Sequence, residues 1–323
     1  MAQARPLRIL VAGAGLFGCE HLDRLTRRAD VQVVGVADPR DDARDRIRAT
    51  YGAPELFPDA LEMLERVPAD GVVIATPSAT HVALTLKALE RGLSVLLEKP
   101  VAPSPALADR LATAAEEKGR LVLPGHVLRF SKDHRRVAEI VASGAIGRPI
   151  YVNSRRYRDD SHATRYSDVD PVLMTLVHDI DLALWFAGAP FRSARAYRKP
   201  GDFRSMTVAT CVTRSGIICD LRTAWTFASG ELPADRVEVV GDQGSVELEL
   251  GRGLSLFSGG TRQAIALDPT DDALANEQAH FLDCLRDPAR KPALTLGDAA
   301  AGLRLAEALL QSIDTGRSVE VGG

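Results

Sequence analysis

The chain has 323 residues, of which 46% are hydrophobic and 26% are charged, a composition that is typical of a folded globular protein and excludes a disordered one. Because one domain usually takes about 150 residues, this length predicts two domains. The 40 basic and 43 acidic residues give a net charge of −3, which excludes a general electrostatic attraction to nucleic acid or to an anionic membrane.

The first part of the chain alternates predicted strands with predicted helices. Short, continuous apolar runs predict strands at residues 7–12, 31–37, 71–75, 93–97 and 121–123. Helical apolar spacing between these runs predicts helices at residues 16–29, 41–50, 79–91 and 107–118. Strands that are apolar along their whole length and are separated by helices form parallel sheets covered on both faces. We therefore expect a doubly wound α/β domain over residues 1–124.

The pattern changes after residue 124. A helix at 132–143, a strand at 150–157, a polar loop and an apolar helix at 169–187 come first. Strands without intervening helices then follow at residues 192–197, 206–213, 217–225, 235–240 and 245–250, and two helices close the chain at 272–286 and 298–313. We expect the strands to form a meander. Residues 125–323 are thus predicted to form an α+β domain with a large open, mainly antiparallel sheet.

The cysteines and the apolar segments indicate the cellular compartment of the protein. No CxxC pair or nearby Cys/His pair exists that could form a metal site, so we expect no metal and buried, reduced thiols at Cys19, Cys211, Cys219 and Cys284. Residues 9–19 follow two arginines and superficially mimic a lipoprotein signal, but they are better explained as a buried strand that leads into a glycine turn. No segment approaches the roughly 20 apolar residues that a membrane span needs. These features predict a cytoplasmic protein.

A glycine motif lies between the first predicted strand and the first predicted helix. Residues 13–18 read Gly-Ala-Gly-Leu-Phe-Gly, and Asp38 follows 20 residues after Gly18 at the end of the second strand. Glycines allow the backbone to approach a pyrophosphate, whose charge then meets the free N–H groups of the helix. Asp38 is placed to bind both ribose hydroxyls, and it would repel a 2′-phosphate. The motif therefore predicts a Rossmann domain that binds NAD; Arg40, two residues on, leaves NADP open. The predicted cofactor contacts here are Gly13, Gly15, Leu16, Phe17, Asp38 and Arg40.

Further motifs extend this pattern along nearly the whole chain. Thr-Pro-Ser-Ala-Thr-His at residues 76–81 and Glu-Lys-Pro at 98–100 each follow a predicted strand. Gly-His-Val-Leu-Arg-Phe at 125–130 and His-Asp-Ile-Asp at 178–181 come later. In order and spacing, the set resembles the Gfo/Idh/MocA family of nicotinamide-dependent oxidoreductases. The resemblance implies further cofactor contacts at Thr76, Pro77, Ser78, His81, Glu98 and Lys99.

The resemblance also implies catalytic roles for Lys99 and His178. Lys99 is expected beside the nicotinamide, with a cis bond to Pro100, where it shares the substrate hydroxyl with His178. A lysine ammonium can release a proton when its surroundings lower its pKa, whereas an arginine effectively cannot. In the family, an aspartate one helical turn earlier usually orients the histidine. Here Met174 stands at that position, and Asp170 and Asp181 are the candidates to replace it.

Three further residues complete the predicted substrate site. By resemblance, His126 and Arg129 border the cleft together with Lys99 and His178; Tyr157 is the third, and it belongs to a polar stretch that could cover the cleft. Residues 155–166 are rich in arginine and aromatic side chains, and we interpret them either as a solvated strand with a subunit contact or as a loop that covers the substrate. In the second case, guanidinium groups that point inward would favour a substrate with a carboxylate or phosphate.

The predicted function is NAD(P)-dependent hydride transfer between the nicotinamide and a secondary alcohol or ketone of a sugar, cyclitol or sugar acid. One alternative is a non-catalytic dinucleotide-binding sensor or partner subunit, which Met174 suggests. Another is a dehydrogenase that acts on a carboxylate-bearing hemiacetal or semialdehyde. Met206, Val208, Cys211 and Val212 place apolar side chains on both faces of the predicted sheet, so one face is expected to point outwards. The resemblance implies that such a face forms a homodimer or homotetramer. The other partner we expect is a small polyol or sugar, with no nucleic acid and no membrane.

Overall fold

The computed structural model describes residues 5–52, 54–167, 169–199, 201–202 and 204–322. The chain divides into two compact units. The first runs up to Val127 and also contains Leu274–Ala300; the second contains Leu128–Ala273 and the chain from Ala301 onward. The sequence predicted a single break near residue 124, so the two descriptions differ in where residues 274–300 are placed. Each unit is described by itself below.

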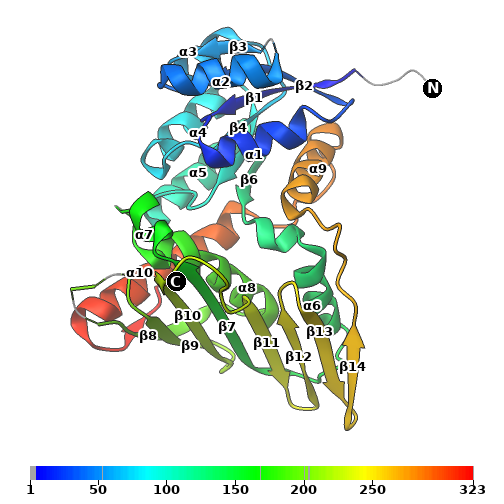
Figure 1. The fold of residues 1–323 in the computed structure, drawn as a ribbon, viewed down its shortest axis with the longest axis vertical. Coiled ribbons are helices and arrows are strands. Elements are labelled where there is room, and N and C mark those ends of the chain that lie inside the picture. Colours follow the sequence, from blue (N-terminus) through cyan, green and yellow to red (C-terminus); the bar gives the residue numbers. More distant parts are fainter. Residues whose placement is uncertain (1–4, 53, 168, 200, 203, 323) are drawn as a thin grey trace. The chain divides into compact units, whose positions relative to one another are not determined.

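The first unit is built on a parallel sheet of six strands within the described residues, in the order β3-β2-β1-β4-β5-β6 (Figure 1). The strands are β1 (Leu7–Ala12), β2 (Val31–Ala37), β3 (Glu55–Phe57), β4 (Gly71–Ile74), β5 (Ser94–Glu98) and β6 (Val122–Gly125). Every residue of β4, β5 and β6 is buried, as expected for strands that are covered on both faces. The predicted Rossmann-like domain is confirmed.

The helices of this unit connect the strands. They are α1 (Leu16–Leu25), α2 (Asp41–Tyr51), α3 (Ala60–Arg66), α4 (His81–Glu90), preceded by the 3₁₀ turn η1 (Ser78–Thr80), and α5 (Pro105–Lys118). Strand order reverses between β1 and β4, which lie side by side although β2 and β3 come between them in sequence. Open α/β sheets bind ligands where the order reverses, outside the carboxyl ends of the strands.

Helix α9 (Ala273–Arg286) packs on this sheet from far along the chain. A Cβ atom on Gly71 of β4 would lie 3.1 Å from the ring of Phe281 and 3.2 Å from Leu285, so the helix lies directly against the strand. Arg286 also pairs with Asp30, which precedes β2, at 2.8 Å. This packing is the reason that residues 274–300 group with the N-terminal unit, and no local sequence pattern encodes it.

The second unit contains a nine-stranded sheet within its described residues, in the order β14-β13-β12-β11-β7-β10-β9-β8-β15. Its strands are β7 (Pro149–Asp159), β8 (Phe191–Tyr197), β9 (Thr207–Thr213), β10 (Ile218–Phe227), β11 (Arg236–Gly241), β12 (Gly244–Glu249), β13 (Gly253–Ser258), β14 (Thr261–Ile265) and β15 (Val319–Glu320). The predicted simple meander is wrong in one respect: β7 separates β10 from β11 and pairs parallel with β10. The remaining pairs are antiparallel, as predicted.

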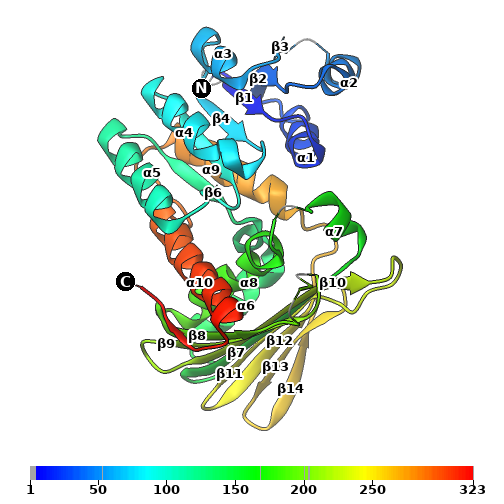
Figure 2. The same cartoon turned by 90° about the vertical axis from the view of Figure 1, so that its left-hand side faces the viewer.

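Helices cover one face of this sheet. In Figure 2, α6 (Lys132–Ala142), α8 (Val177–Ala187) and the later part of α10 (Leu296–Thr315) lie on one side of the sheet. The core of the unit joins the apolar side chains of these helices to the inward side chains of the strands. The opposite face carries a polar network, in which Asp220 accepts hydrogen bonds from Tyr151 and Thr210. Apolar side chains of the unit are also exposed, for example Ile150 at 50% and Ile218 at 45%.

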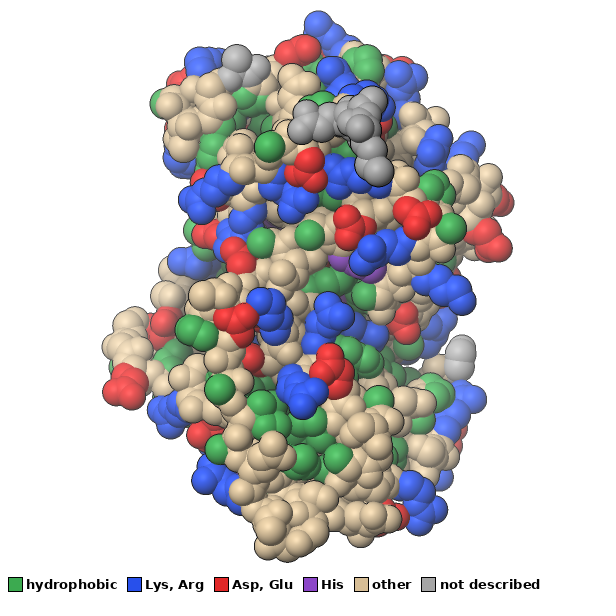
Figure 3. Space-filling model, turned by 90° about the vertical axis from the view of Figure 1, so that its right-hand side faces the viewer, with side chains coloured by type: hydrophobic (Ala, Val, Ile, Leu, Met, Phe, Trp, Pro, Cys, Tyr) green, Lys and Arg blue, Asp and Glu red, His purple; other side chains and the backbone are tan. Residues whose placement is uncertain are grey.

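Several elements escaped the sequence patterns: β3, α3, β13, β14, β15 and the short helix α7 (Ser161–Arg165). Most are short, and β14 is largely exposed, so apolar periodicity carries little signal. Within the part of the chain that the structure describes, no helix combines the length and apolar character needed to span a bilayer. Basic and acidic side chains intermingle on the face shown in Figure 3, in keeping with the nearly balanced charge.

Candidate functional site

The glycine turn after β1 has the conformation that a dinucleotide site requires. Gly13 has φ +98°, and a Cβ atom there would lie 2.5 Å from the Ala75 carbonyl oxygen. A Cβ atom on Gly18 would collide with the Gly13 carbonyl, so that glycine allows α1 to pack against the turn. At Gly15, in contrast, a Cβ atom would meet nothing within 4 Å. The backbone at the start of α1 is thus open to a ligand, and Leu16 and Phe17 beside it are exposed.

Asp38 follows β2 and is held by the same turn. One carboxylate oxygen accepts a hydrogen bond from the Ala14 N–H at 2.9 Å, and the other accepts from the Arg40 N–H at 3.0 Å. The Arg40 guanidinium pairs with the same carboxylate at 3.0 Å. Burial opposes ionisation of Asp38, but the hydrogen bonds from Arg40 and Ala14 outweigh it and lower the pKa. An ionised Asp38 fits ribose hydroxyls, which can donate to it.

The segment after β4 is braced internally. Thr80 Oγ1 donates to the Pro77 carbonyl at 2.8 Å and accepts from Thr76 Oγ1 at 2.7 Å. His81 is buried, and its ring nitrogens face the carbonyls of Thr76 at 2.8 Å and Pro100 at 2.9 Å. Burial lowers the pKa of His81, so the ring is neutral at pH 7 and donates to one carbonyl at a time. His81 therefore connects the segment after β4 to the segment after β5.

The Glu-Lys-Pro segment begins at the last residue of β5. Glu98 is buried, its Oε1 lies 3.0 Å from His21 Nε2, and its Oε2 accepts the Lys99 N–H at 3.2 Å. The Lys99–Pro100 bond is cis, as the resemblance implied. Lys99 itself is partly exposed. Because β4 and β5 are paired, Lys99 and the segment 76–81 extend from neighbouring carboxyl ends.

His178 of the second unit lies in the first turn of α8. The predicted helix 169–187 is not regular, because a π-helical turn (Val172–Leu176) precedes α8. Trp225 donates from its indole N–H to Thr175 Oγ1 at 2.8 Å and holds this turn against β10. Such π turns are frequent at functional sites. Met174, at the position where the resemblance implied an aspartate, lies within the π turn.

Both candidate replacements for that aspartate have arginine partners. Asp181 receives a forked pair of bonds from Arg129, at 2.9 and 2.8 Å, and the same guanidinium lies over the Trp185 ring at 5.4 Å. Asp170 is paired with Arg198 at 2.6 Å. These carboxylates stabilise the frame around α8. The pairing also assigns Arg129 a contact that the sequence did not predict.

Asp179, between these positions, is fully buried and forms a second network. Arg156 of β7 donates to it from Nε at 3.1 Å and from Nη2 at 3.3 Å. The same guanidinium also pairs with Asp235, which Arg158 binds at 2.9 Å. Burial opposes ionisation of Asp235, yet the pKa of Asp235 is lowered by Arg156 and Arg158. Thus the arginines of β7 are used to hold α8 and the start of β11 in place.

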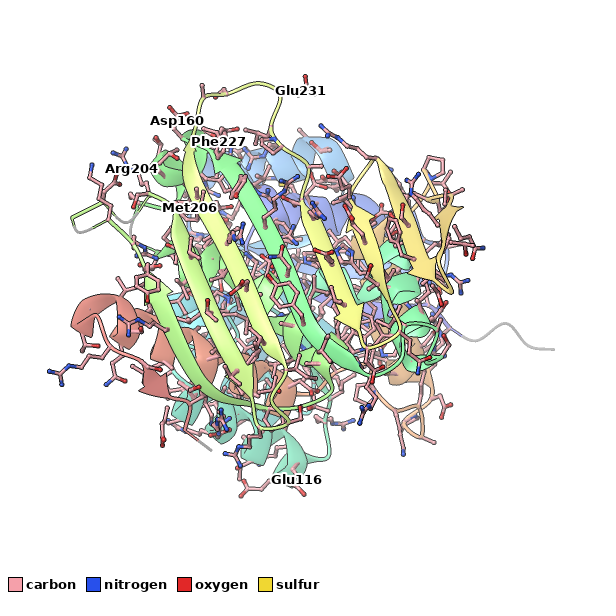
Figure 4. All side chains as sticks on the ribbon, turned by 90° about the horizontal axis from the view of Figure 1, so that it is seen from below. Glu116, Asp160, Arg204, Met206, Phe227 and Glu231 are labelled. Carbon is pink, nitrogen blue, oxygen red and sulfur yellow. The ribbon has the colours of Figure 1, made fainter. Side chains whose placement is uncertain are left out.

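Aromatic residues gather at one end of the second sheet. Tyr157 of β7 stacks on Phe227 of β10 with ring centroids 5.1 Å apart, and Figure 4 labels Phe227 there near Asp160. His162 of α7 lies 5.9 Å from the buried Trp225 ring. The predicted substrate residue Tyr157 is thereby placed at the end of its strand, in the same unit as Arg129 and His178.

The structure thus groups the predicted residues by unit. The first unit brings the cofactor contacts together at the ends of β1, β2, β4 and β5, and His126 follows β6 in the same unit. The second unit contains Arg129, Tyr157 and His178. Sequence reasoning assigned no role to His21 and Glu277, which lie beside Glu98, or to Gln278, which bonds His21; all three are buried. Two signals were available: His21 lies three residues after the glycine motif, and residues 277–282 belong to a stretch that shares the family resemblance.

Comparison with known proteins agrees with this arrangement. Residues 7–126 match the model of an oxidoreductase family with an NAD-binding Rossmann fold, and residues 134–247 match the GFO/IDH/MocA C-terminal domain. Inositol 2-dehydrogenase 4 of Saccharopolyspora erythraea is 32% identical over 66% of this chain and 65% of its own length. Inositol 2-dehydrogenase of Burkholderia cenocepacia is 31% identical over 75% of this chain and 74% of its own length.

A solved structure shares the complete fold. Scyllo-inositol dehydrogenase from Lactobacillus casei, with bound NAD(H) and scyllo-inositol, superimposes with a TM-score of 0.85 over 99% of this chain and 100% of that one, at 19% identity. The glycine turn, the open backbone at Gly15 and the ionised Asp38 fit an NAD molecule. The chain belongs to the Gfo/Idh/MocA family and is an NAD-dependent oxidoreductase.

Proposed function

We propose that this protein catalyses NAD-dependent oxidation of a secondary alcohol on a cyclitol or sugar, or reduction of the matching ketone. The observation that carries the proposal is the position of Lys99. It extends from the carboxyl end of β5, next to the segment after β4, in the unit that has the dinucleotide turn. The similarity to two inositol 2-dehydrogenases supports a cyclitol as the substrate class.

Each predicted site residue has a defined task in this proposal. The N–H groups at the start of α1 bind the pyrophosphate, and Asp38 accepts hydrogen bonds from the ribose hydroxyls. The nicotinamide cofactor, when bound, supplies the hydride acceptor. Lys99 Nζ binds the substrate hydroxyl, and the His178 imidazole shares its proton. His126, Arg129 and Tyr157 are proposed to contact the remaining hydroxyls.

An uncharged polyol fits the second unit better than a carboxylate-bearing substrate. The arginines of β7 that could bind an anion already pair with carboxylates: Arg156 and Arg158 with Asp235, and Arg155 with Glu249 at 3.5 Å. A substrate carboxylate would have to displace these partners. The alternative of a carboxylated hemiacetal or semialdehyde is therefore the second candidate.

The test is NADH formation by the purified protein with NAD and a panel of inositols, aldoses, sugar acids and semialdehydes. We expect turnover with at least one inositol or neutral sugar. Turnover restricted to sugar acids or semialdehydes would favour the carboxylated substrate. Tight NAD binding without NADH formation across the panel would favour the sensor that Met174 suggests, and would contradict the proposed activity.

Coenzyme choice gives a further prediction, since Asp38 and Arg40 are joined by an ion pair. Replacing Asp38 with asparagine keeps a hydrogen-bond acceptor but removes the charge that repels a 2′-phosphate, and it releases Arg40 to bind that phosphate. We expect kcat/KM for NAD to fall and kcat/KM for NADP to rise, changing their ratio by roughly 10- to 100-fold. Asp41→Asn, at an exposed position of α2, is the control. An unchanged ratio in Asp38→Asn would refute this role.

We also propose that the chain forms a homodimer or homotetramer through the uncovered face of the second sheet. Ile218 is 45% exposed and lies on this face of β10, two residues before Asp220, whose carboxylate accepts hydrogen bonds from Tyr151 and Thr210. Light scattering at micromolar concentration should give a mass of at least twice 34.7 kDa. A monomeric mass under these conditions would overturn the proposal.

A further inference from the structure

Three buried acid and base groups meet behind Lys99 in the first unit. His21 of α1, Glu98 of β5 and Glu277 of α9 come from distant parts of the sequence, and each offers one side-chain atom within 4.8 Å of the others. His21 and Glu277 are 0% exposed, and Glu98 is 6% exposed. Glu98 accepts a hydrogen bond from the backbone N–H of Lys99. The contacts that hold the Glu98 side chain in place therefore also help to position the Lys99 segment.

The protons of this group can be assigned from the hydrogen bonds. Gln278 Nε2 lies 2.9 Å from His21 Nδ1 and 3.1 Å from the His21 carbonyl oxygen. A backbone carbonyl only accepts, so the amide nitrogen and not the oxygen of Gln278 must face His21. Gln278 therefore donates to Nδ1, and a neutral His21 carries its proton on Nε2. That N–H points to Glu98 Oε1 at 3.0 Å.

Glu98 and Glu277 consequently have opposite surroundings. The Glu98 carboxylate accepts from the His21 ring and from the Lys99 N–H, two bonds that stabilise its negative charge. Glu277 has no hydrogen-bond partner for either carboxylate oxygen among the described residues. Burial, together with the charge of Glu98, raises the pKa of Glu277 well above its ordinary value. Of the two acids, Glu277 is the one that holds the proton.

We infer that Glu277 is a neutral carboxylic acid in the folded protein and a positioning residue for the Lys99 segment. As a neutral acid it fills the space behind Glu98 without repelling it, so Glu98 can keep its bonds to His21 and Lys99. An ionised Glu277 would place two carboxylates within 4.8 Å in a buried site, and Glu98 would be pushed from the Lys99 N–H. The positioning role rests on the proposed function of Lys99; the protonation state does not.

The same three residue types could instead hold a divalent cation such as Zn²⁺. The proton assignment argues against it, because Nδ1 accepts from Gln278 and Nε2 carries a proton that it donates to Glu98. A bound metal is therefore an outcome that would contradict the inference.

The first test is spectroscopic and does not depend on activity. In the infrared spectrum at pH 7, the C=O stretch of a protonated carboxyl group should be present in the wild-type protein and absent in Glu277→Gln. Metal analysis of the purified protein should find no stoichiometric divalent ion, and EDTA should leave its thermal stability unchanged. A missing carboxyl band, or one equivalent of metal whose removal destabilises the protein, would overturn the inference.

The second test uses the pH dependence of stability. Because the pKa of Glu277 is higher in the folded than in the unfolded state, its contribution is complete at low pH and is lost as pH rises above the ordinary Glu value. The unfolding equilibrium constant of the wild type should therefore rise, relative to Glu277→Gln, by about tenfold per pH unit over that range. Hydrogen exchange of the backbone amides of β5 measures this unfolding equilibrium constant for the first unit. If the ratio of the unfolding equilibrium constants of the wild type and Glu277→Gln does not change with pH, Glu277 is not neutral in the folded protein.

The positioning role is tested by kinetics. Glu277→Leu removes the polar group, and a displaced Lys99 segment should lower kcat by roughly 10- to 100-fold with little change in the Kd for NAD. Glu277→Gln, which preserves a neutral polar group of the same shape, should restore most of this loss. If the leucine variant does not fold, Glu277→Met replaces it. Equal kcat in the wild type and the leucine or methionine variant would show that Glu277 does not position Lys99, even if its carboxyl band is present.

Discussion

Replacing Lys99 with methionine is expected to lower kcat/KM by roughly 10²- to 10⁴-fold, the usual contribution of a positioned acid or base. Methionine keeps the length and apolar stem of lysine but has no group to bind the substrate hydroxyl. Lys99 is one of many predicted cofactor contacts, and the glycine turn and Asp38, which bind the pyrophosphate and the ribose, are unchanged in this variant. The Kd for NAD should therefore change little. Steady-state kinetics, together with NAD titration by fluorescence, separates the two effects.

Lys87→Met is the matched control for this substitution. Lys87 lies in the same unit on α4, where it pairs with the half-exposed Glu65 at 2.6 Å. A surface ion pair of this kind contributes about 1 kcal/mol or less, so the control should remain stable and active. Full activity of Lys99→Met would remove Lys99 from the mechanism, whereas lost NAD binding would mean that the variant is misfolded or that Lys99 serves the cofactor.

Replacing Arg156 with methionine is expected to destabilise the second unit by about 3–5 kcal/mol. Arg156 is 4% exposed and gives the fully buried Asp179 two hydrogen bonds. Without it, Asp179 either remains charged in an apolar environment or must take up a proton. Urea unfolding followed by tryptophan fluorescence measures the effect in this unit, since both tryptophans, Trp185 and Trp225, belong to it.

The loss of stability in Arg156→Met should depend on pH. Burial raises the pKa of Asp179, and removing Arg156 raises it further, so the folded-state pKa lies above the unfolded value. The deficit of the variant is therefore small at low pH, where Asp179 is protonated in both states, and it grows as the pH rises. The double variant with Asp179→Leu should recover much of the stability, because it replaces a broken pair with apolar contacts.

Arg158→Met is the comparison for Arg156→Met. Its side chain is 25% exposed and binds Asp235, which keeps its contact with Arg156. We expect a loss of about 1 kcal/mol or less. Equal losses in both single variants would mean that burial of Asp179 is not the source of the effect.

The sequence by itself determined most of the first unit and the nature of its ligand. The glycine motif, the strand pattern and the spacing to Asp38 lie within about 30 residues of one another, and each follows from local backbone requirements. The segment 76–81 and the cis Lys99–Pro100 bond were likewise accessible, because they directly follow recognisable strands. Local patterns sufficed since a parallel sheet brings successive strand ends to one edge.

Only the tertiary structure decided which groups face one another across long sequence separations. It placed β7 in the middle of the second sheet, paired Asp181 with Arg129 and Asp179 with Arg156, and brought Glu277 to Glu98. The sequence does not show whether an acidic side chain pairs with an arginine, holds a proton or is solvated by water. That choice depends on burial and on the neighbours that packing supplies, and for these residues the neighbours come from helices and strands far along the chain.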